Sequence, residues 1–215
     1  ALNTYSQGHG VRGHKSWNVL PDIKDALNDA FYASFQHVEP ANKRFMLALD
    51  VSGSMGGPEL ANMPGISPRI GAAAMAMTTH RIEPMTHVMA FSSQFVPLDL
   101  SKKDTLETVI RKMSNLPFSS TDCSLPMVYA LEKKIPVDIF VVYTDSETFF
   151  GSHGHPAEIL KKYRHQMDIP AKLVVVGMTA TQFSIADPQD SQMLDVVGFD
   201  ADAPSIIRNF SADEF

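Results

Sequence analysis

The apolar and polar residues of the chain fall into two kinds of pattern. Some stretches repeat apolar residues at i, i+3, i+4 and i+7, the spacing of an amphipathic helix. Others are short, continuous apolar runs bounded by polar residues, which are typical of strands buried on both faces of a sheet. These runs predict strands at residues 44–50, 86–91, 95–100, 137–144, 171–177 and 194–199. Helices are expected at residues 22–39, 69–81, 104–114, 124–134, 156–167 and 204–210.

The order of these elements predicts the fold class. Strands that alternate with helices require right-handed crossovers and give a mainly parallel sheet that is covered on both faces. Residues 86–91 and 95–100 flank Ser92-Ser93-Gln94, a spacing typical of a hairpin. We therefore expect a doubly wound α/β domain with a six-stranded sheet, strand order 3-2-1-4-5-6, and helices on both faces.

Two segments lack a regular period. Residues 1–20 combine glycines, basic residues and Trp17 without a clean pattern. We expect them to form an extended N-terminal arm or a linker from a preceding segment, with residues 21–215 as a single domain. The loop at residues 56–68 is rich in proline and glycine and should be irregular.

Composition narrows the class of protein. The chain has 215 residues, 44% hydrophobic and 20% charged, which allows a sizeable core. No apolar run approaches the roughly 18 residues that span a bilayer, and the first residues do not resemble a signal peptide, so we expect no membrane contact. The single cysteine, Cys123, cannot form an internal disulfide, which favours a reducing, cytoplasmic location. The net charge of -6 indicates that RNA contact by this segment alone should be weak.

Polar side chains follow the predicted core strands at the points where those strands end. Asp50 ends one apolar run and Asp145 follows another, while Ser52 and Ser54 come directly after Asp50. Thr121 lies in a third polar loop, before a predicted helix. Because ligand sites of parallel sheets lie beyond the carboxyl ends of the strands, we expect these five side chains to meet at one edge.

Two carboxylates and three hydroxyls form an all-oxygen set, the kind of ligand that hard cations prefer. Mg²⁺ is the leading candidate, and Mn²⁺ or another divalent cation would also suit the set. Mg²⁺ accepts few protein ligands and keeps several waters. Such a metal site would therefore leave a coordination position for an acidic side chain of a protein partner.

Several of these residues also have simpler interpretations. Asp50 could only cap a loop by accepting backbone N–H groups, and Thr121 with Asp122 could only begin the helix that follows them. His153 and His155 could form a short metal-binding pair, but an exposed loop before the next helix explains them better.

Catalytic motifs are not evident along the chain. The run DVSGSMG fails the nucleophile-elbow pattern because Ser52 occupies the place of its first glycine, and no GxxxxGK[ST] phosphate loop follows a strand. Cys123 as a nucleophile would need a base and an oxyanion site, so a structural thiol is the better interpretation. We expect a protein that is not an enzyme, with a metal-assisted phosphoryl- or acyl-transfer enzyme as an alternative.

The spacing Asp50-x-Ser52-x-Ser54, with Thr121 and Asp145 in order downstream, resembles the metal-ion-dependent adhesion site (MIDAS) of von Willebrand factor A domains. This resemblance covers residues 44–211. It implies that the five residues are metal ligands, in a doubly wound α/β fold with one antiparallel edge strand.

A further resemblance, to the von Willebrand factor A-like C-terminal domain of the Ro (SS-A) ribonucleoproteins (TROVE family), spans nearly the whole chain. The stretches that carry it are STDCSLPM, TDSETF, MDIPAKLVVVGMT, SIADPQD, GFD and IIRNF, with TYSQGHGVRG in the arm and VEPANKRF before the first strand. Two features depart from the family pattern: the loop at residues 56–68 is richer in proline, and Ser119 replaces an expected glycine.

The Ro resemblance implies a function in RNA binding. Members of that family bind small noncoding Y RNA and misfolded RNA in the cytoplasm and nucleus, mostly through a ring of helical repeats that would precede Ala1. It implies that residues 1–20 are an arm from that missing RNA-binding domain. We expect a monomeric, metal-binding interaction module of a ribonucleoprotein. The alternative is an adhesion-type domain that captures an extracellular matrix protein such as collagen through its metal.

Overall fold

A six-stranded sheet forms the centre of the computed structural model, which describes residues 1–36, 38–57, 59–61, 63–117, 121–145, 153–179, 185–200 and 202–214. The strands are β1 (Arg44–Asp50), β2 (Met85–Phe91), β3 (Phe95–Pro97), β4 (Ile139–Thr144), β5 (Lys172–Gly177) and β6 (Met193–Val197). Their order is β3-β2-β1-β4-β5-β6, and only the β2–β3 pairing is antiparallel. The predicted strand order and hairpin are therefore confirmed.

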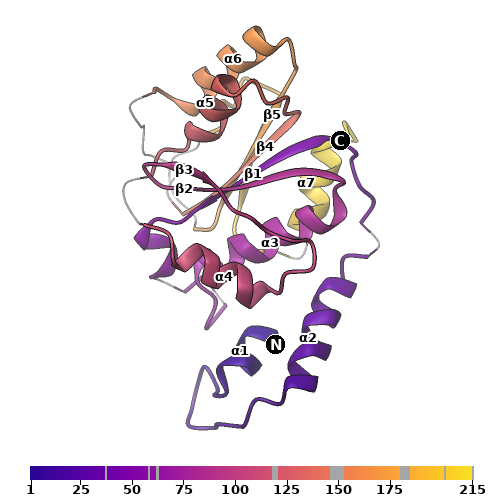
Figure 1. Cartoon of the computed structure of the whole chain (residues 1–215), viewed down its shortest axis with the longest axis vertical. Helices are drawn as coiled ribbons and strands as arrows, with labels where there is room; N and C mark the ends of the chain where they lie inside the picture. Colours follow the sequence, from indigo (N-terminus) through magenta and orange to yellow (C-terminus); the bar gives the residue numbers. More distant parts are fainter. Residues whose placement is uncertain are drawn as a thin grey trace.

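Helices cover both faces of this sheet (Figure 1). One face carries α3 (Pro68–Ile82), α4 (Leu106–Ser114) and α7 (Ala203–Ser211). The other carries α5 (Leu125–Glu132) and α6 (Pro156–Met167). Strand β1 supplies both cores, because Phe45, Leu47 and Leu49 join the first cluster and Met46 and Ala48 join the second. At about 1.5–3 kcal/mol for each large apolar side chain that is fully buried, the apolar run of β1 fixes this strand in the centre of the sheet.

Side-chain caps set the first residues of α3 and α4. Ser67 caps α3 by accepting a hydrogen bond from the amide of Ile70 at 3.4 Å, and Pro68 occupies the first helical position. Thr105 caps α4 by accepting from the amide of Thr108 at 3.3 Å. The predicted start of this helix at Asp104 is therefore wrong by a short margin, because the hydroxyl of Thr105 takes the capping position.

The N-terminal segment contains two helices, α1 (Leu2–Gln7) and α2 (Pro21–Ala33), which lie at the lower end of the molecule in Figure 1. The expectation of an extended arm is therefore wrong for residues 2–7. Trp17 stacks on Tyr5 with ring centres 6.1 Å apart, and its indole N–H donates to the carbonyl of Tyr5 at 3.0 Å. The phenol oxygen of Tyr5 accepts from the amide of Leu20 at 3.1 Å, so aromatic contacts fold this segment back on itself.

Polar and ring contacts, together with apolar packing of Leu2, Phe31 and Tyr32, attach these helices to the rest of the molecule. The guanidinium carbon of Arg81 lies 3.1 Å from the ring centre of Tyr32, and Lys24 forms an ion pair with Glu107. The side-chain amide of Asn3 donates to the carbonyl of Gly65 at 2.7 Å. The division between residues 1–20 and 21–215 stays a prediction. Within the described ranges, no helix has both the length and the apolar character needed to cross a membrane.

Candidate metal centre

The ends of β1 and β4 place the predicted site residues at one edge of the sheet. The two strands are parallel neighbours, and Leu49 pairs with Tyr143 in their register. Asp50 and Thr144, the next residue of each strand, therefore lie side by side, and Asp145 follows. This edge is the carboxyl end of the parallel strands, where open α/β sheets place their ligand sites.

Asp50 is the buried centre of a hydrogen-bond network. Its carboxylate is inaccessible to solvent, and its Oδ1 accepts from the amide of Ser52 at 2.8 Å. Its Oδ2 accepts from the hydroxyl of Thr144 at 2.7 Å and lies 3.5 Å from the donor hydroxyl of Thr121. The Asp50 carboxylate thus contacts three segments of the chain, which are the loop after β1, the end of β4 and the loop before α5.

The two serines connect this buried carboxylate to the surface. The hydroxyls of Ser52 and Ser54 lie 3.1 Å apart, and Ser54 Oγ donates to Asp145 Oδ1 at 3.1 Å. Ser52 is buried, Asp145 is half-buried and Ser54 is exposed. The structure therefore brings all five predicted residues into one hydrogen-bonded network that runs from the core to solvent.

The hydrogen bonds that hold the buried Asp50 carboxylate come from neutral groups, the amide of Ser52 and the hydroxyl of Thr144. Burial raises the pKa of Asp50, hydrogen bonds from Thr144 and Ser52 oppose that rise, and the nearby Asp145 adds to it. A buried carboxylate that is stabilised only by neutral donors remains costly to ionise. A divalent cation at this edge would lower that cost by placing positive charge beside both carboxylates.

The chemistry of the donor set fits a hard cation. Two carboxylates and three hydroxyls supply only oxygen, as Mg²⁺ and Mn²⁺ prefer. Nowhere in the described ranges do three or more His, Cys, Asp or Glu side chains gather in a metal-binding arrangement. A metal at this edge would therefore depend on the hydroxyls of Ser52, Ser54 and Thr121, with waters completing the coordination.

The alternative roles of neighbouring residues are resolved by their contacts. Thr121 points to Asp50, whereas Asp122 organises the start of α5 by accepting from the amide of Ser124 at 3.0 Å. His155 begins α6, because its Nδ1 accepts from the amide of Ala157 at 3.2 Å. The interpretation of this region as a loop before the helix is thereby confirmed.

Two other candidates have structural surroundings. His153 is exposed, and its Nδ1 lies 3.3 Å from Asp122 Oδ2. Cys123 is fully buried, and burial raises the pKa of its thiol. Since the thiolate is the nucleophilic form, this environment suits a structural cysteine. Ser119 and the motif residues 146–149 lie outside the described residues.

Sequence reasoning missed two residues of this edge, Thr144 and Arg69. Thr144 bonds Asp50, and its signal is the pairing register, which can be written down only once β1 and β4 are known to be neighbours. Arg69 is the second residue of α3, and its Nη2 donates to the carbonyl of Ser52 at 3.3 Å. No sequence pattern singles it out, because the path of the preceding loop decides its position.

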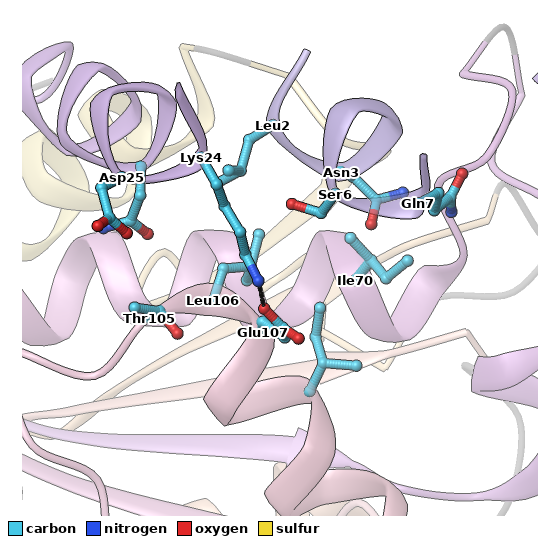
Figure 2. A pocket seen from close by; sticks show the side chains of 12 residues that line it. Leu2, Asn3, Ser6, Gln7, Lys24, Asp25, Ile70, Thr105, Leu106 and Glu107 are labelled. Carbon is cyan, nitrogen blue, oxygen red and sulfur yellow. Dashed lines mark hydrogen bonds and ion pairs between the residues drawn. The ribbon is translucent and has the colours of Figure 1, made fainter. Parts of the chain in front are cut away.

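A separate cavity of about 250 Å³ lies between the N-terminal helices and the α3–α4 side of the domain (Figure 2). Leu2, Ile70 and Leu106 form apolar walls, and the ion pair of Lys24 with Glu107 spans it. None of the five oxygen-bearing residues of the candidate centre lines this cavity. It therefore does not contribute to the metal site.

The fold and the oxygen-lined edge together define a von Willebrand factor A-type α/β domain. The family model described as "Ro60 vWA domain" matches residues 44–211, which is most of the chain. This chain belongs to the Ro60 vWA domain family. The resemblance to the Ro ribonucleoproteins that the motifs predicted is thereby confirmed.

Relatives and solved structures agree with this assignment. The RNA-binding protein RO60 of Deinococcus radiodurans is 48% identical over 98% of this chain, and RNA-binding protein RO60 of Caenorhabditis elegans is 40% identical over 98%. The chain spans only 39% and 32% of the length of these two relatives. The crystal structure of the Deinococcus radiodurans Ro (RSR) protein matches the whole chain with a TM-score of 0.84 and 47% identity, over 43% of its own length.

A distant match shows the fold alone. Proximal thread matrix protein 1 from the mussel byssus superposes on 81% of this chain, and on 49% of its own, with a TM-score of 0.52 and 11% identity. At that identity, only the α/β architecture is shared.

Proposed function

We propose that this chain is the divalent-cation-binding interaction module of a Ro60-type RNA-binding ribonucleoprotein. The observation that carries the proposal is the hydrogen-bonded network that joins Asp50 to the amide of Ser52, and the hydroxyl of Ser52 through that of Ser54 to Asp145. Its position beyond the carboxyl ends of β1 and β4 supports a ligand site. Its composition supports Mg²⁺ as the ligand, with Mn²⁺ as a substitute.

Each side chain would contribute differently to the metal site. The hydroxyls of Ser52, Ser54 and Thr121 would hold the ion through their oxygen lone pairs. Asp145 is half-buried at the outer end of the set, and it would bind the ion directly or through water. Asp50 has both carboxylate oxygens engaged by protein donors, so its main role would be to orient the hydroxyls and to supply charge.

Mg²⁺ retains exchangeable coordination positions, and an acidic side chain of a protein partner would occupy one of them. The function of the domain would then be to make a metal-dependent contact with another protein. The relatives are named as RNA-binding proteins rather than enzymes, which supports a role without catalysis. The same names offer no support for the collagen-binding alternative.

RNA would be bound mainly by another part of the complete protein. The relatives are much longer than this chain, and the chain itself has a net charge of -6. Phosphate contacts dominate nucleic-acid affinity, and an acidic domain gains little from them. We propose that this domain is a monomer that contacts RNA weakly by itself and acts in the cytoplasm and nucleus.

Titration calorimetry with Mg²⁺ and Mn²⁺ tests the metal site directly. Asp145→Asn preserves the shape of the side chain and removes one charge at the outer end of the site. We expect it to weaken Mg²⁺ binding at least about tenfold, or ~1.4 kcal/mol. Asp99→Asn is the matched control, because Asp99 is exposed outside this edge and loses the same charge.

Two outcomes would contradict the proposal. One is the absence of heat on titration of the unaltered chain with either cation. The other is equal weakening of Mg²⁺ binding in Asp145→Asn and Asp99→Asn, which would show a general charge effect rather than a site.

A further inference from the structure

Arg69 contacts the loop that carries the two serines. It is the second residue of α3, directly after Pro68. Its Nη2 donates to the carbonyl of Ser52 at 3.3 Å, and its Nη1 donates to the hydroxyl of Ser114 at 3.3 Å. One guanidinium thus joins the loop after β1, the start of α3 and the last residue of α4.

The short 3₁₀ turn η1 (Gly53–Gly56) lies directly against the same guanidinium. A Cβ atom added to Gly56 would lie 3.3 Å from both terminal nitrogens of Arg69, a spacing tighter than most van der Waals contacts. Ser54 is part of this turn, and Ser52 precedes it. The segment with both serine hydroxyls is therefore supported by Arg69 at its start and at its end.

The peptide groups of Ser52 are fixed from two sides. Its amide donates to Asp50 Oδ1 at 2.8 Å, and its carbonyl accepts from Arg69 Nη2 at 3.3 Å. With both groups engaged, the backbone at Ser52 has little freedom to rotate, and its Oγ is directed toward Ser54, 3.1 Å away.

The charge of Arg69 would by itself oppose a metal at this edge. Like charges repel, so a fixed guanidinium near a divalent cation weakens its binding unless the guanidinium contributes something else. Burial lowers the pKa of Arg69, whereas the negative charge of Asp50 raises it. The hydrogen bond to Ser52 and the contact with Gly56 supply a geometric reason for an arginine at this position.

We propose that Arg69 is a positioning residue, which holds Ser52 and Ser54 in the arrangement that a divalent cation needs. The inference rests on the metal-binding function proposed above. An arginine suits this role because its planar guanidinium can donate to Ser52 and Ser114 at the same time, whereas the single ammonium of lysine cannot span both acceptors in one plane.

Two substitutions separate geometry from charge. Arg69→Lys keeps the positive charge but loses the planar guanidinium that donates to both Ser52 and Ser114. Arg69→Gln loses the charge and the guanidinium. If Arg69 acts through geometry, both variants should bind Mg²⁺ more weakly, by about fivefold to tenfold, or ~1–1.4 kcal/mol. If it acted only through charge, Arg69→Gln would bind Mg²⁺ more tightly and Arg69→Lys would be unchanged, which would overturn the proposal.

The measurements are Mg²⁺ titration calorimetry and the electron paramagnetic resonance spectrum of bound Mn²⁺, with thermal unfolding in EDTA. Arg111→Gln is the matched control, since Arg111 is exposed on α4. A lower unfolding temperature with unchanged Mg²⁺ affinity and unchanged Mn²⁺ spectrum would show a merely structural role and would also overturn the proposal.

Gly56→Ala approaches the same contact from the loop side. Its added methyl group should press on the guanidinium and weaken Mg²⁺ binding a few-fold, so it carries the test if an Arg69 variant does not fold. The same measurements distinguish a failure of the proposed metal-binding function from a failure of the inference about Arg69. If the unaltered chain does not bind Mg²⁺, the metal site and this inference both fall. Suppose instead that the unaltered chain binds Mg²⁺ and Asp145→Asn does not. If the Arg69 and Gly56 variants then bind Mg²⁺ as tightly as the unaltered chain, only the inference about Arg69 falls.

Discussion

The carboxylates at the two ends of the β1–β4 strand pair accept hydrogen bonds from different kinds of donor. At the amino end, Asp138 accepts from the backbone amide of Arg44 at 2.8 Å and from its guanidinium through Nε at 2.9 Å and Nη2 at 2.5 Å. At the carboxyl end, Asp50 and Asp145 accept from the backbone and from hydroxyls. The hydrogen bonds from Arg44 lower the pKa of Asp138, whereas burial raises the pKa of Asp50.

The difference in donors indicates a structural role for Asp138, whereas Asp50 is the carboxylate that we propose supports a ligand. Asp138 has its counter-charge within the same fold, so nothing further is needed to stabilise it. Asp50 is more deeply buried, yet the donors on its oxygens are neutral. The same pair of strands therefore ends in an ion pair on one side and, on the other, in the edge that we propose binds an external cation.

Removal of Asp50 should have the largest effect. Asp50→Ala leaves the amide of Ser52 and the hydroxyl of Thr144 buried without their acceptor, and we expect a loss of about 2–4 kcal/mol in the free energy of unfolding. Urea unfolding in EDTA measures this loss without a metal contribution. A loss below about 1 kcal/mol would show that Asp50 does not organise the network.

Thr144→Val should have an intermediate effect. Valine has nearly the shape of threonine but cannot donate to Asp50, so the carboxylate loses one charged hydrogen bond. We expect about 1.5–3 kcal/mol of destabilisation in urea unfolding, the range for a hydrogen bond to a charged group. Thr108→Val serves as a comparison, because its hydroxyl lies 3.1 Å from the neutral hydroxyl of Thr105. Equal losses in the two variants would argue against a special role for Thr144.

Asp138→Asn should have the smallest effect, and this effect should depend on pH. The pair is partly exposed, with 37% of the Arg44 side chain and 26% of the Asp138 side chain accessible, so we expect about 1 kcal/mol or less at pH 7. Because the folded pKa of Asp138 is lowered, its contribution is present above the unfolded pKa of about 3.9 and disappears as pH falls through the folded value.

The pH series is measured as the difference in unfolding free energy between Asp138→Asn and the unaltered chain, from pH 7 to pH 2.5. The difference should shrink as the carboxyl is protonated. Mg²⁺ affinity should not change in this variant at pH 7, since Asp138 lies at the opposite end of the strands. A clear loss of Mg²⁺ affinity in this variant would contradict the proposed distinction between the two ends.

The fold was largely predictable because its strands are buried on both faces. The runs around Leu47 and Val141 are apolar at every core position, so they indicate central strands without tertiary information. The alternation of elements indicated a doubly wound sheet, and the observed strand order is a common one of that class. The gathering of Asp50, Ser52, Ser54, Thr121 and Asp145 followed from their places in the loops beyond strand ends. That these residues hold a metal ion stays a prediction.

The remaining features depend on contacts between distant parts of the chain. The α1 helix is too short to be indicated by its own pattern, and the stacking of Trp17 on Tyr5 stabilises the fold of its segment. Arg69 reaches Ser52 only because the intervening loop returns α3 to the end of β1. The choice of Thr105 over Asp104 as the cap of α4 is a competition between adjacent good capping residues, which local preference cannot decide.

Diffraction from crystals soaked in Mn²⁺, recorded at a wavelength where manganese scatters anomalously, shows whether the carboxyl edge of the sheet holds a divalent cation. We expect one strong anomalous peak at the carboxyl edge, in contact with the hydroxyls of Ser52 and Ser54 and beside Asp145, and none at the Arg44–Asp138 pair. The absence of a peak at this edge, in crystals that were soaked at millimolar Mn²⁺ and whose packing leaves the edge open to solvent, would contradict the metal assignment.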